Sequence, residues 1–268
     1  YNAFQIDATP YLKAGQRNVI EVTLNNVEES SRWYPGGGLY RPVWLTLSAD
    51  AHISDWGTFI RTTMVKGEGR KAVLTISSHI EGLEHRRALA SVEYALFDAD
   101  GHCVARSEEA LDAIGNCATE LTLSKAHLWS PETPYLYSLR TRLTVDGRTM
   151  DEATNKVGVR TILVDGKGFH LNGKLRKFQG VCLHHDLGPL GAAVNRAALI
   201  RQIRILKDMG CDAIRTAHNM PSTMQMEVCD SMGMMVMAES FDMWLYPKCK
   251  NGYALHFRDW AERDMTNL

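Results

Sequence analysis

Three short groups of polar residues in the last hundred positions carry side chains suited to a polyhydroxylated ligand. Each group follows a short apolar segment that is typical of a buried parallel strand. Carboxylates, amides, imidazoles and a guanidinium offer paired hydrogen-bond donors and acceptors for sugar hydroxyls, and an aromatic plane fits the apolar face of a sugar ring. The candidates are His184, His185 and Asp186, then Arg215, His218 and Asn219, and finally Glu239, Asp242 and Trp244.

Each group taken alone has a simpler interpretation. A single His or Asp at a strand end is usually a cap or a loop hydrogen bond, and Trp244 could be a core or interface aromatic. A transition-metal site is another interpretation of several His with carboxylates, but no two His residues have the i, i+4 spacing of a helical zinc site. Three consecutive strands that all end in polar residues are harder to explain by packing, so we predict a substrate-binding site without metal ligands.

The segments around these groups predict the order strand, helix, strand, helix, strand. The first helix has apolar residues at Leu199, Ile203 and Leu206, with Asn195 as a plausible N-cap. This order predicts a parallel sheet that opens either a doubly wound sheet or a (β/α)8 barrel, in which the carboxyl ends of the strands form the floor of the active site. The expected strands are 177–183, 212–216 and 234–238, and the expected helices are 195–209 and 221–233.

The first 163 residues show the alternation of β-strands instead. In residues 1–50 we predict strands at 18–24 and 41–47, too few to close a sandwich, so this part is interpreted as the end of a domain. Residues 51–163 alternate repeatedly, with turn signals at 98–101 and 146–147, and predict a seven-stranded immunoglobulin-like sandwich. Clear strands in it are 71–76, 90–97 and 137–143.

Composition narrows the class of protein. Hydrophobic residues make up 45% and charged residues 23% of the chain, as in ordinary globular proteins, and a net charge of −1 argues against a nucleic-acid partner. No apolar run is long enough for a membrane span. The six scattered cysteines predict buried free thiols. The N-terminus has neither a signal peptide nor an initiator Met, which leaves the compartment open between cytoplasm and periplasm.

Six motifs, in order, resemble the family 2 glycoside hydrolases. They are Ser31–Tyr34 with Gly38–Leu45, Leu128–Tyr137, Val157–Ile162, Phe169–Lys174, Arg215–Asn219 and Ala238–Trp244. The resemblance implies three parts: residues 1–50 as the C-terminal part of a sugar-binding-like jelly-roll domain, 51–163 as the immunoglobulin-like sandwich, and 164–268 as the first strands of a (β/α)8 catalytic barrel.

The same resemblance implies an activity and a role for the nine candidates. Glu239-x-Phe241-Asp242-x-Trp244 is most similar to the β-galactosidases of a bacterial type, while β-glucuronidase and β-mannosidase members stay open as alternatives. The parent enzyme is expected to hydrolyse terminal β-D-galactosides with retention, and the nine candidates to shape the sugar pocket. Some members bind magnesium or sodium, but their ligand pattern is not evident here, so we expect no cofactor.

Retaining hydrolysis needs two carboxyl groups on either side of the scissile bond. In the family these are a Glu after an Asn on barrel strand four and a Glu on strand seven, which the resemblance places beyond Leu268. The chain contains no Asn-Glu, so we expect it to be inactive alone. Glu239 and Asp242 could approach each other, but would lie on one side of the sugar.

Two further expectations follow. A non-catalytic carbohydrate-binding or scaffold module is the alternative of a different class. Three strands of an open barrel would leave apolar surface exposed, so we expect the last hundred residues to be partly disordered or covered by another copy or a complementary chain.

Overall fold

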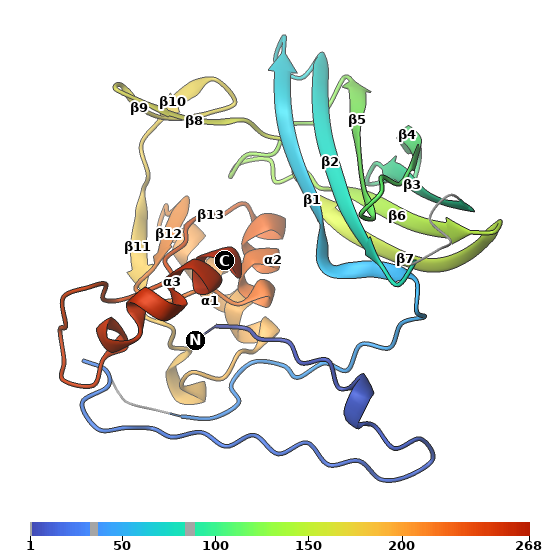
Figure 1. Ribbon diagram of the computed structural model, residues 1–268. Helices are drawn as coiled ribbons and strands as arrows, with labels where there is room; N and C mark the ends of the chain where they lie inside the picture. The colour runs from blue at the N-terminus through green and yellow to red at the C-terminus, as the bar shows by residue number, and fades with distance from the viewer. Residues whose placement is uncertain (1, 33–36, 84–88) are drawn as a thin grey trace. The chain divides into compact units, whose positions relative to one another are not determined.

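The computed structural model describes residues 2–32, 37–83 and 89–268, which form two compact units (Figure 1). One unit comprises Trp44–Phe178 with Asp230–Gly233 and holds the antiparallel sheets. The other comprises Tyr1–Val43, Gln179–Cys229 and Met234–Leu268 and holds the parallel sheet. Among the described residues, no helix is long and apolar enough to cross a membrane.

The first unit is built on seven antiparallel strands in two sheets, within its described residues. One sheet has the order β1-β2-β5 and the other β4-β3-β6-β7. The predicted immunoglobulin-like sandwich is confirmed. Its fourth strand pairs with the third strand and not with the fifth. The strands are β1 His52–Lys66, β2 Lys71–Glu81, β3 Ala90–Phe97, β4 Cys103–Ala110, β5 Asn116–Ser124, β6 Tyr137–Val145 and β7 Arg148–Val157.

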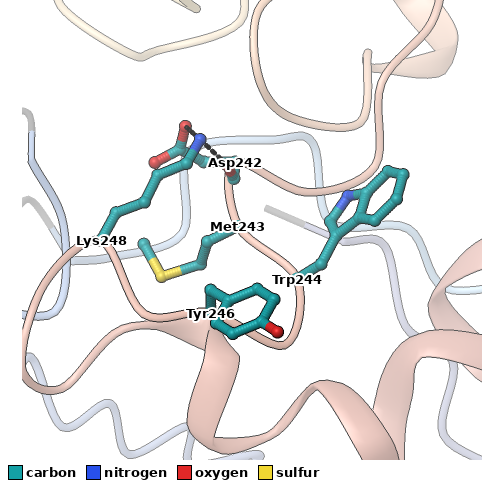
Figure 2. Close-up of a pocket in the computed structure, with 5 residues that line it drawn as sticks. All are labelled: Asp242, Met243, Trp244, Tyr246 and Lys248. Atoms are coloured by element: carbon teal, nitrogen blue, oxygen red, sulfur yellow. Dashed lines mark hydrogen bonds and ion pairs between the residues drawn. The ribbon is translucent and has the colours of Figure 1, made fainter.

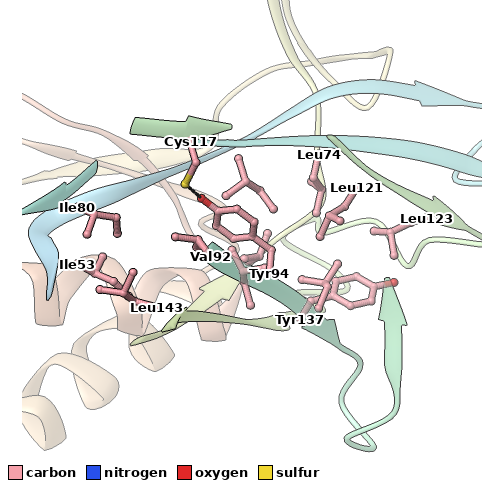
Figure 3. Close-up of a cluster of buried hydrophobic side chains, with 14 of the residues drawn as sticks. Ile53, Leu74, Ile80, Val92, Tyr94, Cys117, Leu121, Leu123, Tyr137 and Leu143 are labelled. Atoms are coloured by element: carbon pink, nitrogen blue, oxygen red, sulfur yellow. Dashed lines mark hydrogen bonds between the residues drawn. The ribbon is translucent and has the colours of Figure 1, made fainter. Parts of the chain in front are cut away.

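The sandwich core follows directly from the alternation of side chains along the strands. In β6 every second residue from Tyr137 to Val145 is buried, and those from Leu139 to Val145 pair across to β3 in a regular antiparallel register. Figure 3 shows the buried side chains of this cluster, with the Tyr94 hydroxyl 3.0 Å from the Cys117 Sγ. Burial raises the pKa of Tyr94 well above its usual value. The pattern visible in the sequence is thus the pattern that fills the core.

A three-stranded meander follows the sandwich. It consists of β8 Ile162–Asp165, β9 Gly168–Leu171 and β10 Lys174–Arg176. The motif Phe169–Lys174 spans the β9–β10 hairpin, and its turn is formed by two left-handed residues, Asn172 (φ 52°) and Gly173 (φ 76°). Arg176 on β10 donates to Glu132, with Nη1 3.1 Å from Oε2, and so holds the meander to the loop before β6.

The second unit contains the predicted alternation of strands and helices. The strands β11 Gly180–Leu183, β12 Ala213–Thr216 and β13 Met235–Met237 pair in parallel, in that order. Helix α1 Arg196–Asp208 begins after Asn195, whose side chain accepts from Ala198 N at 3.0 Å, and buries Leu199, Ile203 and Leu206 as predicted. Helix α2 Thr223–Met232 links β12 to β13. The resulting sheet is open, as expected for the start of a barrel.

Helix α3 Phe257–Thr266 and the short 3-10 turn Tyr253–Leu255 were not predicted. The buried residue of α3 is Asp264, which accepts from the Tyr253 hydroxyl at 2.5 Å. An apolar stripe is the signal from which a helix is predicted, and here the buried face is polar. Apolar periodicity therefore did not predict this helix.

The strands predicted at 18–24 and 41–47 are absent from the described residues. The chain is extended there but has no ladder partner, and alternate apolar side chains such as Val19 and Trp44 are largely exposed. The physical reason is that a strand needs a hydrogen-bonded neighbour, which alternation by itself does not supply. The described residues before β1 contain one 3-10 turn, Thr9–Tyr11. The domain boundaries at 50 and 163 stay predictions.

The cysteine prediction is correct in one respect and wrong in another. All six thiols are free, but Cys103 and Cys182 are exposed, and Cys117 and Cys229 are the buried ones. A thiol is small enough to fit either environment, so residue type alone does not fix burial.

Tyr94 provides a test of the sandwich core. Its side chain is fully buried, so Tyr94→Ala should lower the free energy of unfolding by about 3–5 kcal/mol, by loss of apolar contacts and creation of a cavity. Tyr94→Phe keeps the ring and loses the hydroxyl contact with Cys117, for about 1 kcal/mol. Urea unfolding measures both, and equal losses for the two variants would contradict the packing assignment.

The Glu132–Arg176 pair predicts a pH dependence. The Arg176 hydrogen bond lowers the Glu132 pKa from 4.5 to about 2. A depressed carboxyl pKa gives stability that is present above the unfolded-state value and lost as the pH falls through the folded value. Glu132→Gln should therefore cost roughly 0.5–1 kcal/mol near pH 7, since the carboxylate is largely solvent-exposed. This cost should shrink between pH 4.5 and 2, and a pH-independent cost in thermal unfolding would contradict the pair.

Candidate functional site

The end of β12 turns sharply and brings two candidate residues together. Arg215 lies in the strand, and after Thr216 the peptide bond Ala217–His218 is cis. The turn is closed by Asn219 N donating to Thr216 O at 3.1 Å. As a result the side chains of Arg215 and His218 lie side by side, with Arg215 Nη2 3.4 Å from His218 Nδ1.

Glu239 joins these two residues from the neighbouring strand. It follows β13, and its backbone N donates to Thr216 Oγ1 at 3.0 Å, which fixes it beside the β12 turn. Arg215 Nε donates to Glu239 Oε1, and His218 Nδ1 lies 2.9 Å from Glu239 Oε2. The hydrogen bond that Arg215 donates to Glu239 raises the pKa of Arg215, so the guanidinium stays charged. Arg215, His218 and Glu239 thus form one partly buried polar triad.

Asp242 lies three residues farther along the same loop and is held by two cations. Arg32 grips both carboxylate oxygens, with Nη2 2.6 Å from Oδ1 and Nε 3.1 Å from Oδ2. Lys248 Nζ lies 3.2 Å from Oδ1 (Figure 2). Partial burial opposes ionisation of Asp242, but the hydrogen bonds from Arg32 and Lys248 outweigh it and lower its pKa. His218 Nε2 is 3.9 Å from Oδ1, so Asp242 adjoins the triad.

Arg32 was missed in the sequence. It stands 210 residues before Asp242, in a loop that resembled part of another domain. No spacing rule connects two residues so far apart. Its position in the Ser31-Arg32 motif was the sole signal, and that motif carried a family resemblance without a role.

The three residues after β11 take three different places. The His184 ring meets the His218 ring edge to face at 5.3 Å between centroids, so His184 joins the triad. His185 (φ 54°) is half-buried against Tyr40, at 5.0 Å, and burial, with Arg41 second, lowers its pKa. The Asp186 carboxylate accepts from Gly188 N at 2.6 Å, so it bonds to the backbone at the start of the 3-10 turn Gly188–Leu190.

Asn219 and Trp244 lie at the margins of the triad. Asn219 lines a small cavity of about 10 Å³ together with His185 and buried residues that include Thr216 and Gln225. Trp244 is 68% exposed, which rules out the interpretation as a core aromatic within this chain. It lines a hollow of about 260 Å³ with Asp242, Met243, Tyr246 and Lys248 (Figure 2).

The electrostatics suit binding better than acid or nucleophilic chemistry. Glu239 is occupied by Arg215 and His218, and Asp242 by Arg32 and Lys248. The lowered pKa keeps Asp242 ionised and thus unable to donate a proton near neutral pH. Within the described ranges, the one cluster of three groups able to hold a metal is Asp98, Asp100 and His102, in the β3–β4 turn and outside this site.

Two family models match the chain. The model of the glycosyl hydrolases family 2 matches residues 51–160, and the model of the TIM barrel domain of that family matches residues 162–246. The chain is 41% identical over its whole length to β-galactosidase BoGH2A of Bacteroides ovatus, of which it covers 32%. It is 34% identical to a putative β-glucuronidase of Formosa agariphila, with 99% of the chain and 25% of that protein aligned.

A solved structure agrees with these matches. The crystal structure of a glycosyl hydrolase family 2 member from Bacteroides cellulosilyticus superimposes with a TM-score of 0.91 at 34% identity, covering all of this chain and 35% of that one. The chain therefore spans about a third of the length of the relatives that it matches. The sandwich, the strands that start the barrel and these matches together place the chain in family 2 of the glycosyl hydrolases.

Proposed function

We propose that the protein hydrolyses terminal β-D-galactosides with retention, and that this chain forms one wall of the pocket for the terminal sugar. The observation that carries the proposal is the contact of Arg215, His218 and Glu239 at the carboxyl ends of β12 and β13. This end of the strands is where barrels build their sites. The 41% identity with a protein named β-galactosidase supports galactose as the sugar.

The geometry suggests a role for each candidate. Glu239 and Asp242 offer acceptor lone pairs beyond those used by their cations, and Arg215 offers donors, so each can bind hydroxyls while held in place. His184 and His218 extend this polar wall, and Trp244 offers an apolar face to a ring. We assign His185 and Asp186 to the support of the wall, through Tyr40 and the Gly188 turn. Asn219 borders the small cavity beneath.

The bond-breaking carboxyl groups are proposed to lie elsewhere in the protein. Retaining hydrolysis needs a nucleophile and an acid about 5–5.5 Å apart, on opposite sides of the bond. Glu239 and Asp242 follow one strand and both face His218, so they lie on one side of any ring bound there. We therefore retain the expectation that both catalytic Glu residues come after Leu268.

A β-glucuronidase-type activity is the second candidate. Several relatives carry that name, including one from Bacteroides fragilis at 29% identity. A uronate needs a cationic partner, and the site holds three cations, Arg32, Arg215 and Lys248, against two carboxylates. Each cation is already paired, which favours a neutral sugar.

The proposed function predicts turnover of 4-nitrophenyl β-D-galactoside by the product of the complete gene. The β-anomer of galactose should form first, as NMR of the fresh product would detect. The 268-residue chain alone should bind galactose but show no turnover above background. Turnover by the purified chain would contradict the assignment of the catalytic pair, and binding without turnover by the complete gene product would favour a carbohydrate-binding module.

Arg215 provides a test of the site itself. Arg215→Lys retains the charge but loses the planar donor set that contacts both Glu239 and His218. In the complete gene product we expect kcat/KM for the galactoside to fall by about a hundredfold, or roughly 2.7 kcal/mol. The matched control is Arg204→Lys, on an exposed position of α1. Equal activity of the two variants would exclude Arg215 from the site.

A further inference from the structure

Two cations from distant parts of the chain converge on one carboxylate at the rim of the candidate site. Arg32 comes from the N-terminal segment and Lys248 from the loop after β13, and both contact Asp242. The Asp242 side chain is 15% exposed, whereas Arg32 and Lys248 are 40% and 44% exposed. The carboxylate therefore lies inward and the cations face solvent around it.

This arrangement borders an open hollow lined by two aromatic side chains and two charged ones. Asp242, Met243, Trp244, Tyr246 and Lys248 line about 260 Å³ (Figure 2). Trp244 and Tyr246 are 68% and 87% exposed. The Trp244 ring stacks on Phe257, with 6.4 Å between centroids, and its exposed surface can contact a ligand. Such aromatic faces bind the apolar side of sugar rings and do not distinguish a neutral ring from a charged one. Charge selection must therefore come from the ionised groups at the wall.

The ionised groups at this wall lie around Asp242, and their positive and negative charges offset one another. Facing its carboxylate are Arg32, Lys248 and, at 3.9 Å, the His218 Nε2. Glu239 is held by Arg215 and His218 and leaves no uncompensated charge there. Removal of the Asp242 charge would take away the carboxylate that Arg32 and Lys248 share, and a carboxylate on a ligand is the group that would replace it best.

We infer that Asp242 is a specificity-determining residue, which masks Arg32 and Lys248 and makes the hollow beside Trp244 select uncharged sugar rings over uronate rings. The inference rests on the proposed function, because it concerns which sugar the same site accepts. It gives the N-terminal segment a part in specificity, through Arg32. Galactose and glucuronic acid, the sugars in the names of the relatives, differ in the carboxylate at C6 and in the configuration at C4. The inference concerns the carboxylate alone.

A purely structural clamp is the competing explanation. Lys248 also donates to the Asp242 main-chain oxygen, so the cluster shapes the loop as well. The two explanations predict different measurements. Loss of a clamp lowers kcat/KM for neutral and charged substrates by the same factor, whereas loss of a mask changes their ratio.

The test uses the complete gene product and two substrates with one aglycone, 4-nitrophenyl β-D-galactoside and 4-nitrophenyl β-D-galacturonide. In Asp242→Asn the ratio of kcat/KM for the uronide to that for the galactoside should rise at least tenfold, about 1.4 kcal/mol. The rise should shrink in high salt, because the new pairing is exposed. Asp242→Glu should keep the wild-type ratio, since it keeps the mask.

Two further variants separate charge at the site from overall charge and from misfolding. Glu227→Gln makes the same charge change at a surface pair with Arg196, and its ratio should equal that of the wild type. The double variant Arg32→Gln with Lys248→Gln should lower the ratio at least tenfold, because these two cations then no longer offset the negative charge of Asp242. This double variant keeps the prediction testable if Asp242→Asn does not fold.

An unchanged ratio in both Asp242→Asn and the double variant would overturn the inference and leave the clamp. If the wild-type protein hydrolyses neither substrate, the proposed function fails, and the inference is then tested by binding. Saturation-transfer NMR with galactose and galacturonate should show the same shift of preference toward galacturonate in Asp242→Asn. Absence of that shift would overturn the inference independently of activity.

Discussion

The parallel register of β11, β12 and β13 is the constraint on which the site depends. Gly180 pairs with Ala213 and Ala213 with Met235, so the three strands run level from their first residues. A side chain at 180 would meet Ala213 O at 2.1 Å, so this close pairing requires glycine. β11 and β12 also end level, at Leu183 and Thr216, and β13 ends one residue earlier, at Met237, which pairs with Arg215. His184, His218 and Glu239 follow these strand ends and come into contact through His218, although they are distant in sequence.

Charge pairing converts that proximity into a defined geometry. Arg215 and His218 each bind a different oxygen of Glu239, which leaves the carboxylate little freedom to rotate. Charge-assisted hydrogen bonds in a partly buried setting are stronger than those in bulk water. A sugar hydroxyl that arrives at such a wall meets oriented acceptors and donors, so less conformational entropy is lost on binding. Pairing with cations also withdraws the carboxylates of Glu239 and Asp242 from acid–base chemistry.

The sequence predicted the features that depend on local rules. The limits of α1, its Asn195 cap and the alternation in β6 follow from periodicity, capping and pleating, which act over a few residues. What it missed depends on contacts over long distances. Arg32 reaches Asp242 across 210 residues, and the apolar alternation of 18–24 has no ladder partner among the residues that the structure describes. Residue type and position at a strand end indicated the region in which the nine site candidates lie. Contacts in three dimensions decided which of the nine touch one another.

His184, His185 and Asp186 illustrate why position at a strand end does not fix a role. His184 meets His218, whereas His185, whose backbone is left-handed (φ 54°), packs on Tyr40. Asp186 then uses its carboxylate on the backbone of the next turn. All three residue types suit a sugar, yet one faces the triad. Backbone torsions, which residue type constrains weakly outside glycine and proline, make this choice.

Glu93, in the sandwich, is a second acid held by more than one cation. Comparison of Glu93 with Asp242 shows what separates a structural ion cluster from a functional one. Glu93 on β3 contacts Arg106 on β4 and Arg140 and Arg142 on β6, all on strands of one sheet. Its partners are fixed by cross-strand register, and such pairs contribute to sheet pairing. Asp242 instead gathers cations from two separate segments, beside a hollow with exposed aromatic faces. Cross-strand register does not explain this convergence of cations. The adjacent hollow provides a place where a ligand can be selected by its charge.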